Sequence, residues 1–206
     1  MSNEKRSLEP KVSDIVVYHK RDAARTQLET AITLWFHYGD PISIHTLAAA
    51  ANKCYHGMGS KVGKPTVIQV WKKSLSRKNY DRVVKAENFA KHANTDADAT
   101  LHLMTAQAAL LMLDSTVCHE KMFGRRTPLM TLFFARFAFE NPRLAESLNL
   151  ARRKEGLQDL VIEQPEKTDR VQFFNQELPA LVAASSGIRD SIVRFEEGHT
   201  ESPESK

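Results

Sequence analysis

The chain has 206 residues, of which 42% are hydrophobic and 26% charged, and its formal net charge is +4. This length suffices for one sizeable core, and the composition excludes a disordered or fibrous chain. Gly and Pro number only 8 each, and apolar residues recur at helical spacing, so the sequence predicts an all-α fold.

The sequence also predicts a cytoplasmic protein. No apolar run follows the first residues, so we expect no signal peptide. The longest apolar stretch, residues 106–113, is far too short to cross a bilayer, and we expect no membrane contact. Both cysteines, Cys54 and Cys118, lie in apolar helical surroundings and are predicted to be reduced core thiols.

Apolar periodicity and polar ends divide the chain into four parts. Residues 1–14 and the tail, 197–206, are polar and predicted to be disordered. Residues 15–123 are predicted to form a bundle of four to five helices. Residues 124–196 are predicted to be a helical C-terminal extension packed on that bundle.

Within the bundle, a first helix is predicted over about 20–38 and a second, capped by its first residue, over 43–55. A glycine-rich loop is expected at 57–65. Further helices are predicted over 79–93 and, long and apolar, over 105–121.

Between the loop and the third of these helices, Val67, Ile68, Val70 and Trp71 are predicted to form a short helix or a hydrophobic clamp. In the extension, Thr127-Pro128 and Asn141-Pro142 each open a helix. A final helical pair is expected over 169–195, interrupted near 185–187.

Positive charge is concentrated in residues 61–91. Only Asp81 and Glu87 oppose nine basic residues there, which are Lys61, Lys64, Lys72, Lys73, Arg77, Lys78, Arg82, Lys85 and Lys91. Such a local excess can meet phosphate, so the segment is a candidate RNA-binding surface. The alternative is a solvated helical face.

Polar side chains are densest at residues 87–98, where one helix is expected to end. At 100° per residue, Asp81, Lys85, Asn88 and His92 fall on one stripe of that helix. In this row His92 could act as a general acid or base, with Lys85 and Asn88 positioning a phosphate. Alternatively, His92 caps the helix and complements its dipole.

A further alternative is a metal site or a small-molecule site made by His92, Asp96, Asp98 and His102, since imidazole and carboxylate ligate many divalent ions. The Thr95-x-x-Asp98 spacing equally fits a capping box or a turn. Nothing in the sequence fixes four ligands together, so neither a metal nor a cofactor is predicted.

Three motifs resemble a group of functionally uncharacterised bacterial proteins. They are residues 21–32 (RDAARTQLETAI), 39–51 (GDPISIHTLAAAA) and 88–99 (NFAKHANTDADA). The likeness covers about residues 20–120, and the joint occurrence of the three motifs is fairly specific. The resemblance brings no activity with it.

A helical bundle with Asn-x-x-x-His near the end of its third helix is also similar to the HEPN superfamily. Its members are often dimeric, and many are RNases, while others serve as binding modules. The catalytic motif of that family is Arg, four to six residues, then His. The resemblance implies that His92 is the family's histidine, with Lys85 where the family has Arg. Lysine cannot make the bidentate phosphate contact of arginine.

The sequence therefore leaves three hypotheses. The first is a HEPN-like RNA-binding protein or a metal-independent ribonuclease. The second is a non-catalytic interaction protein that forms a homodimer. The third is a small-molecule or metal-binding bundle.

Overall fold

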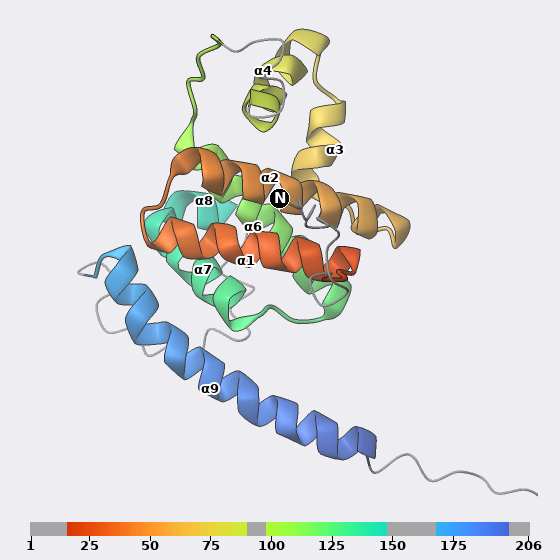
Figure 1. Ribbon diagram of the computed structural model, residues 1–206, viewed down its shortest axis with the longest axis vertical. Coiled ribbons are helices and arrows are strands. Elements are labelled where there is room, and N and C mark those ends of the chain that lie inside the picture. Colours follow the sequence, from red (N-terminus) through yellow and green to blue (C-terminus); the bar gives the residue numbers. More distant parts are fainter. Residues whose placement is uncertain (1–15, 90–97, 148–167, 198–206) are drawn as a thin grey trace, which may run out of the picture.

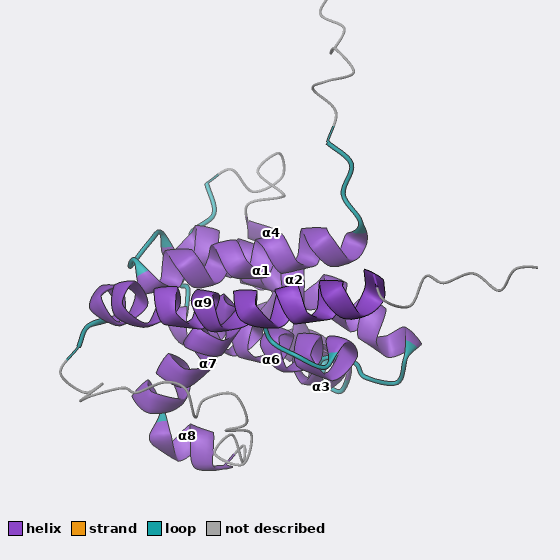
Figure 2. Ribbon diagram, turned by 90° about the horizontal axis from the view of Figure 1, so that it is seen from below, coloured by secondary structure: helices purple, strands orange, loops and turns teal. Residues whose placement is uncertain are grey.

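The computed structural model describes residues 16–89, 98–147 and 168–197, without the side chains of residues 82 and 186–197. In these parts the chain forms only helices and their connections, with no β-strand (Figures 1 and 2). The predicted all-α bundle is confirmed. None of the described helices combines the length and the apolar character needed to cross a bilayer.

The described helices follow one another along the chain as eight segments. They are α1 (Lys20–Phe36), α2 (Pro41–Lys61), α3 (Val67–Lys73), α4 (Arg77–Phe89), α6 (Thr105–Phe123), α7 (Pro128–Glu140), α8 (Pro142–Ser147) and α9 (Arg170–Glu197).

Helix α2 lies at the centre of the bundle, since α1, α3, α4 and α6 all contact it (Figure 1). Ala48 and Ala51 are completely buried on it. Their small side chains let the neighbouring helices approach closely, and Tyr55, also completely buried, fills the core one turn further on.

Aromatic side chains join α1, α7 and α9. Trp35 of α1 meets Phe133 of α7 edge to face, with ring centroids 5.1 Å apart. Phe36 stacks on Phe173 of α9 with centroids 6.4 Å apart. Such pairs contribute about 0.5–1.5 kcal/mol beyond the burial of their area. The start of α9 is thereby fixed to the bundle.

The first helical connection shows how local chemistry ends one helix and begins the next. Tyr38 has a positive φ of 52°, a conformation that reverses the chain after α1. Asp40, rather than the predicted Ser43, caps α2, because its carboxylate accepts the Ser43 N–H at 2.8 Å. The predicted start of α7 is confirmed, since Thr127 Oγ1 accepts the Met130 N–H at 3.3 Å.

Two predicted breaks are wrong. Helix α2 continues through Gly57 and Gly59 to Lys61, where a loop was expected. Helix α9 is continuous through residues 185–187, where an interruption was expected. A single Gly lowers helix stability by only about 1 kcal/mol relative to Ala, which an otherwise favourable helix tolerates.

Gly59 is required by packing rather than by a turn. A Cβ at this position would overlap the carbonyl oxygen of Lys64 and lie 2.9 Å from its carbon, with Cys118 Sγ at 3.1 Å. The chain turns back here so closely that the Lys64 N–H donates to the Gly59 carbonyl at 2.7 Å.

We therefore expect Gly59→Ala to lower the free energy of unfolding by about 1–3 kcal/mol, because the backbone of the turn must shift. Gly57→Ala is the matched control: nothing lies within 4 Å of its Cβ, and alanine favours the helix. Urea unfolding of both variants checks the prediction, and equal stabilities for the two would contradict it.

Candidate nucleic-acid interface

Helices α3 and α4, with the connection 98–104, form a lobe at one end of the molecule (Figure 1). We call this part the α3–α4 lobe. It contains most of the basic segment 61–91. The contacts that attach the lobe to the other helices determine which of its charged side chains remain available to a ligand.

Asp114 of α6 anchors the start of α3. Its Oδ1 accepts the Val67 N–H and its Oδ2 the Ile68 N–H, both at 2.9 Å. These are two of the N–H groups that a helix start leaves without an internal partner, so Asp114 caps α3 from another helix. Asn52 of α2 also donates to Asp114 Oδ2, at 3.2 Å. The contacts tie α3 to the two central helices.

A buried ion pair between Lys72 and Glu87 ties α3 to α4. Only 2% of the Lys72 side chain and 14% of the Glu87 side chain is exposed. His45 of α2 is completely buried nearby, where burial lowers its pKa. Neither of its ring nitrogens has a hydrogen-bond partner among the described residues. Lys72 is therefore part of the scaffold and is not free to meet phosphate.

Other basic residues of the segment 61–91 are exposed but engaged. Arg77 pairs with Asp81 one turn along α4, at 3.1 Å. Lys64 Nζ donates to the carbonyl of Lys121 at 2.6 Å. These contacts are at the surface, where a phosphate could compete with them.

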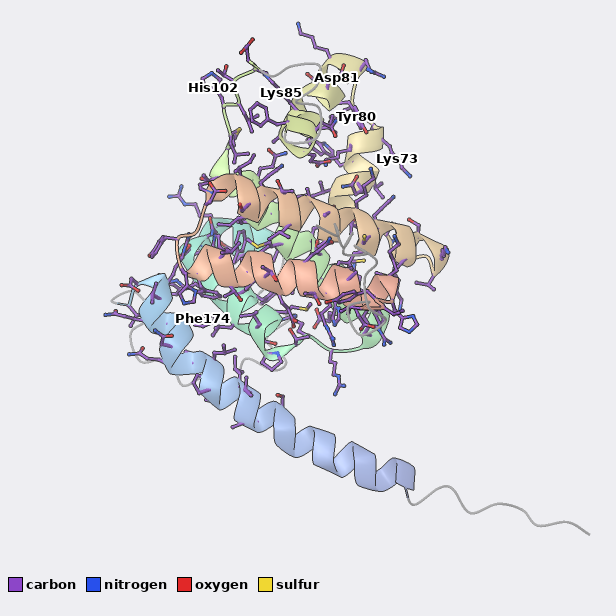
Figure 3. All side chains as sticks on the ribbon, in the orientation of Figure 1. Lys73, Tyr80, Asp81, Lys85, His102 and Phe174 are labelled. Atoms are coloured by element: carbon purple, nitrogen blue, oxygen red, sulfur yellow. The ribbon has the colours of Figure 1, made fainter. Side chains whose placement is uncertain are left out.

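Five lysines of the segment are exposed and make no ion pair with any described residue, and two of them, Lys64 and Lys85, donate to backbone carbonyls. The other three are Lys61, Lys73 and Lys78. Figure 3 shows Lys73 projecting from the outer side of the lobe. The side chain of Arg82 and the whole of Lys91 lie outside the described residues. The lobe thus presents uncompensated positive charge.

Two aromatic side chains are exposed on the helices that carry Lys73 and Lys78. Trp71 of α3 is 50% exposed and Tyr80 of α4 is 40% exposed. Figure 3 shows Tyr80 at the same end of the molecule as Lys73. The short helix predicted here is confirmed as α3. The alternative, a hydrophobic clamp, is only partly present, since Ile68 is half-buried, whereas Val67, Val70 and Trp71 face solvent.

The predicted polar row is present as far as the structure describes it. Lys85 and Asn88 are exposed on α4, while Ala86 is buried. Lys85 Nζ donates to the carbonyl of Thr100 at 3.2 Å, which holds the connection against α4. The last member of the row, His92, lies outside the described residues.

The alternative metal ligands are only half described. Asp98 and His102 are exposed on the connection after α4, and Figure 3 shows His102 at the same end of the molecule as Lys85. His92 and Asp96 lie outside the described residues. In the part of the chain that is described, no three His, Cys, Asp or Glu side chains come together to hold a metal ion.

Reasoning from the sequence did not single out Trp71 and Tyr80 as exposed residues, because it placed Trp71 in a short helix or a hydrophobic clamp and assigned nothing to Tyr80. A signal was present: Trp71 directly precedes Lys72 and Lys73, and Tyr80 lies between Lys78 and Arg82. Interleaving of this kind is typical of surfaces that stack bases and bind phosphates.

The fold and the surface together define an all-α protein with a basic, aromatic lobe. No protein-family model, curated protein or solved structure matches the chain. The resemblances to a bacterial protein group and to the HEPN superfamily therefore stay predictions.

Proposed function

We propose that this chain is a cytoplasmic RNA-binding protein that holds single-stranded RNA on the α3–α4 lobe. The observation that carries the proposal is the exposure of Trp71 and Tyr80 among lysines whose charge is not compensated. Stacking of one base on an aromatic side chain contributes about 1–3 kcal/mol and tolerates any sequence. Lysines that neutralise phosphates add affinity that depends on salt.

The free state of both cysteines supports the cytoplasmic location. Cys118 is buried, and burial raises the pKa of its thiol to about 11, so it is an inert core residue rather than a nucleophile. In this proposal the candidate catalytic residues are therefore those of the polar row, Lys85, Asn88 and His92.

A ribonuclease is the catalytic form of the same proposal. Its specific support is that Lys85 and Asn88 are both exposed on α4, seven and four residues before His92 in the sequence. His92 would exchange the proton, and Lys85 would stabilise developing charge on phosphate. Purified protein should then cleave RNA equally in EDTA and in Mg²⁺, and His92→Ala should abolish cleavage. Binding without cleavage would remove the catalytic form alone.

Binding itself is tested by fluorescence anisotropy with a labelled single-stranded RNA oligonucleotide. We expect affinity to fall steeply with salt, and Lys73→Ala or Lys78→Ala to lower the slope of log affinity against log salt by about 0.7 each. Trp71→Ala should weaken binding about tenfold without changing the slope, because it removes stacking and no charge.

Arg143→Ala is the matched control, because it removes one positive charge from α8, an exposed position outside the lobe. It should leave the affinity and the slope unchanged. If Arg143→Ala weakens RNA binding as much as Lys73→Ala, RNA is attracted by the overall positive charge of the protein rather than by the α3–α4 lobe, and the proposal fails.

The second candidate is a homodimer formed through α3. The apolar side chains of Val67, Val70 and Trp71 are about half exposed or more. Sedimentation in the absence of RNA distinguishes the RNA-binding protein from the homodimer. A dimer that Trp71→Ala dissociates, together with no RNA binding, would favour the interaction protein.

A further inference from the structure

A hollow of about 490 Å³ lies away from the α3–α4 lobe, between the start of α1, the end of α6, the connection before α7 and the middle of α9. Its lining contains four arginines, Arg21, Arg25, Arg125 and Arg126, and no acidic residue among the described side chains. We call it the arginine pocket. Its size falls within the usual range for small-molecule sites, about 300–1,000 Å³.

Arg126 is built into the wall of this pocket. Its side chain is only 4% exposed, and its guanidinium lies 3.7 Å from the centre of the Phe134 ring. One of its terminal nitrogens donates to Glu120 at 3.0 Å. Its Nε–H is buried and has no acceptor among the described residues. Because leaving a buried donor unused is unfavourable, the site is prepared for an additional acceptor.

The charges around the pocket do not cancel. Arg21 and Arg25 share one carboxylate, Asp22, at 3.5 and 3.7 Å. Arg126 has Glu120, and Arg125 is exposed with no ion pair to a described residue. Among the described side chains, these four guanidinium groups have two carboxylate partners, which leaves an excess of two positive charges.

His119 lines the pocket without adding to this charge. Burial, and then the nearby Arg25, Arg125 and Arg21, lower the pKa of His119 to about 4. Its Nδ1 lies 3.0 Å from the hydroxyl of Tyr55, which fixes the ring. Near neutral pH the ring is uncharged, and it packs against the Phe123 ring, with the centroids 4.7 Å apart and the two planes tilted by 55°.

Part of the remaining wall is apolar, formed by Phe123, Pro128 and Val182, and Thr127 and Ser185 complete it. A bare inorganic anion would leave this surface in water. A ligand with an anionic group and an apolar or aromatic part uses both sides of the pocket.

We propose that the arginine pocket binds a small phosphate monoester, with its phosphate on the arginines and its organic group against Phe123 and Pro128. A phosphate monoester carries close to two negative charges above its second pKa of about 6, which matches the excess of two positive charges. Guanidinium groups suit it, since each can bind two phosphate oxygens at once.

Calorimetric titration of the full chain with phenyl phosphate at pH 7.5 tests the proposal. Phenyl phosphate should bind and raise the melting temperature. Inorganic phosphate, which lacks the ring, and phenyl sulfate, which has the ring but a single charge, should each bind at least tenfold more weakly. No binding of phenyl phosphate at millimolar concentration, or equal binding of all three compounds, would overturn it.

Arg125→Ala should weaken phenyl phosphate about tenfold, because it removes a charge-assisted contact from an exposed side chain without disturbing the core. Phe123→Leu should weaken phenyl phosphate and leave inorganic phosphate unchanged. Arg143→Ala again serves as the control of equal charge, and circular dichroism verifies that each variant is folded. If Arg143→Ala and Arg125→Ala weaken binding equally, the pocket is not the site.

Discussion

Replacing Lys72 by methionine is expected to lower the free energy of unfolding by about 3–5 kcal/mol, because Glu87 then keeps a largely buried charge without a partner. Lys72 is 2% exposed and lies where α3, α4 and α2 meet. Urea unfolding of the full chain measures the change. RNA binding should weaken as well, since the ion pair holds the two helices of the lobe together.

Two controls make this prediction specific. The double variant Lys72→Met, Glu87→Met removes both charges, and it should recover much of the lost stability. Arg77→Met breaks the pair with Asp81, whose side chains are 88% and 53% exposed. It should lower stability by less than about 1 kcal/mol. If the Lys72→Met variant is as stable as the Arg77→Met variant, burial does not determine how much an ion pair contributes to stability here, and the prediction is wrong.

The second large effect is expected in mild acid, between pH 6.5 and 4. The pKa of His119 is about 4 in the folded protein, against 6.5 for an ordinary histidine. In this interval the unfolded chain binds a proton that the folded protein does not, so stability falls as the pH falls. The full contribution of His119 is up to about 3 kcal/mol, and it is complete above pH 6.5. His45, whose pKa is also lowered by burial, acts in the same direction.

Chemical unfolding at a series of pH values checks this expectation. His119→Gln should flatten the dependence between pH 6.5 and 4, because it removes the group that must take up the proton. His102→Gln changes an exposed histidine of the α3–α4 lobe and should leave the dependence as it is. A His119→Gln protein with the same pH dependence as the natural chain would show that other groups cause the effect.

Three helix starts were predictable because they depend on neighbouring residues. Lys20 and Thr105 begin helices where the periodicity indicates, and Pro128 begins one directly after its capping residue Thr127. The end of α2 was not predictable, because Gly59 is read locally as a helix breaker. Its actual role is to let the carbonyl of Lys64 approach, which only the folded turn reveals.

The candidate site was predictable only where it depends on neighbouring residues in the sequence. The exposed face of α4 follows from helical geometry, which is local. That Lys72 is buried against Glu87, whereas Lys73 is free, depends on how α3 packs, and the sequence treats the two lysines alike. The arginine pocket joins residues 21–25 with residues 125–126, about a hundred positions apart. Only the adjacent Arg125 and Arg126 after Gly124 could have drawn attention to it.

The central place of α2 has a consequence for the order in which the chain folds. Its partner α1 is joined to it by residues 37–40 alone, so the two can form a helical hairpin with little loss of chain entropy. Helix α6 can then close on the hairpin, and its arrival supplies Asp114, the cap of α3. We therefore expect the α3–α4 lobe to complete its structure after the helices that support it, although it precedes α6 in the sequence. Local contacts of the hairpin kind favour rapid folding.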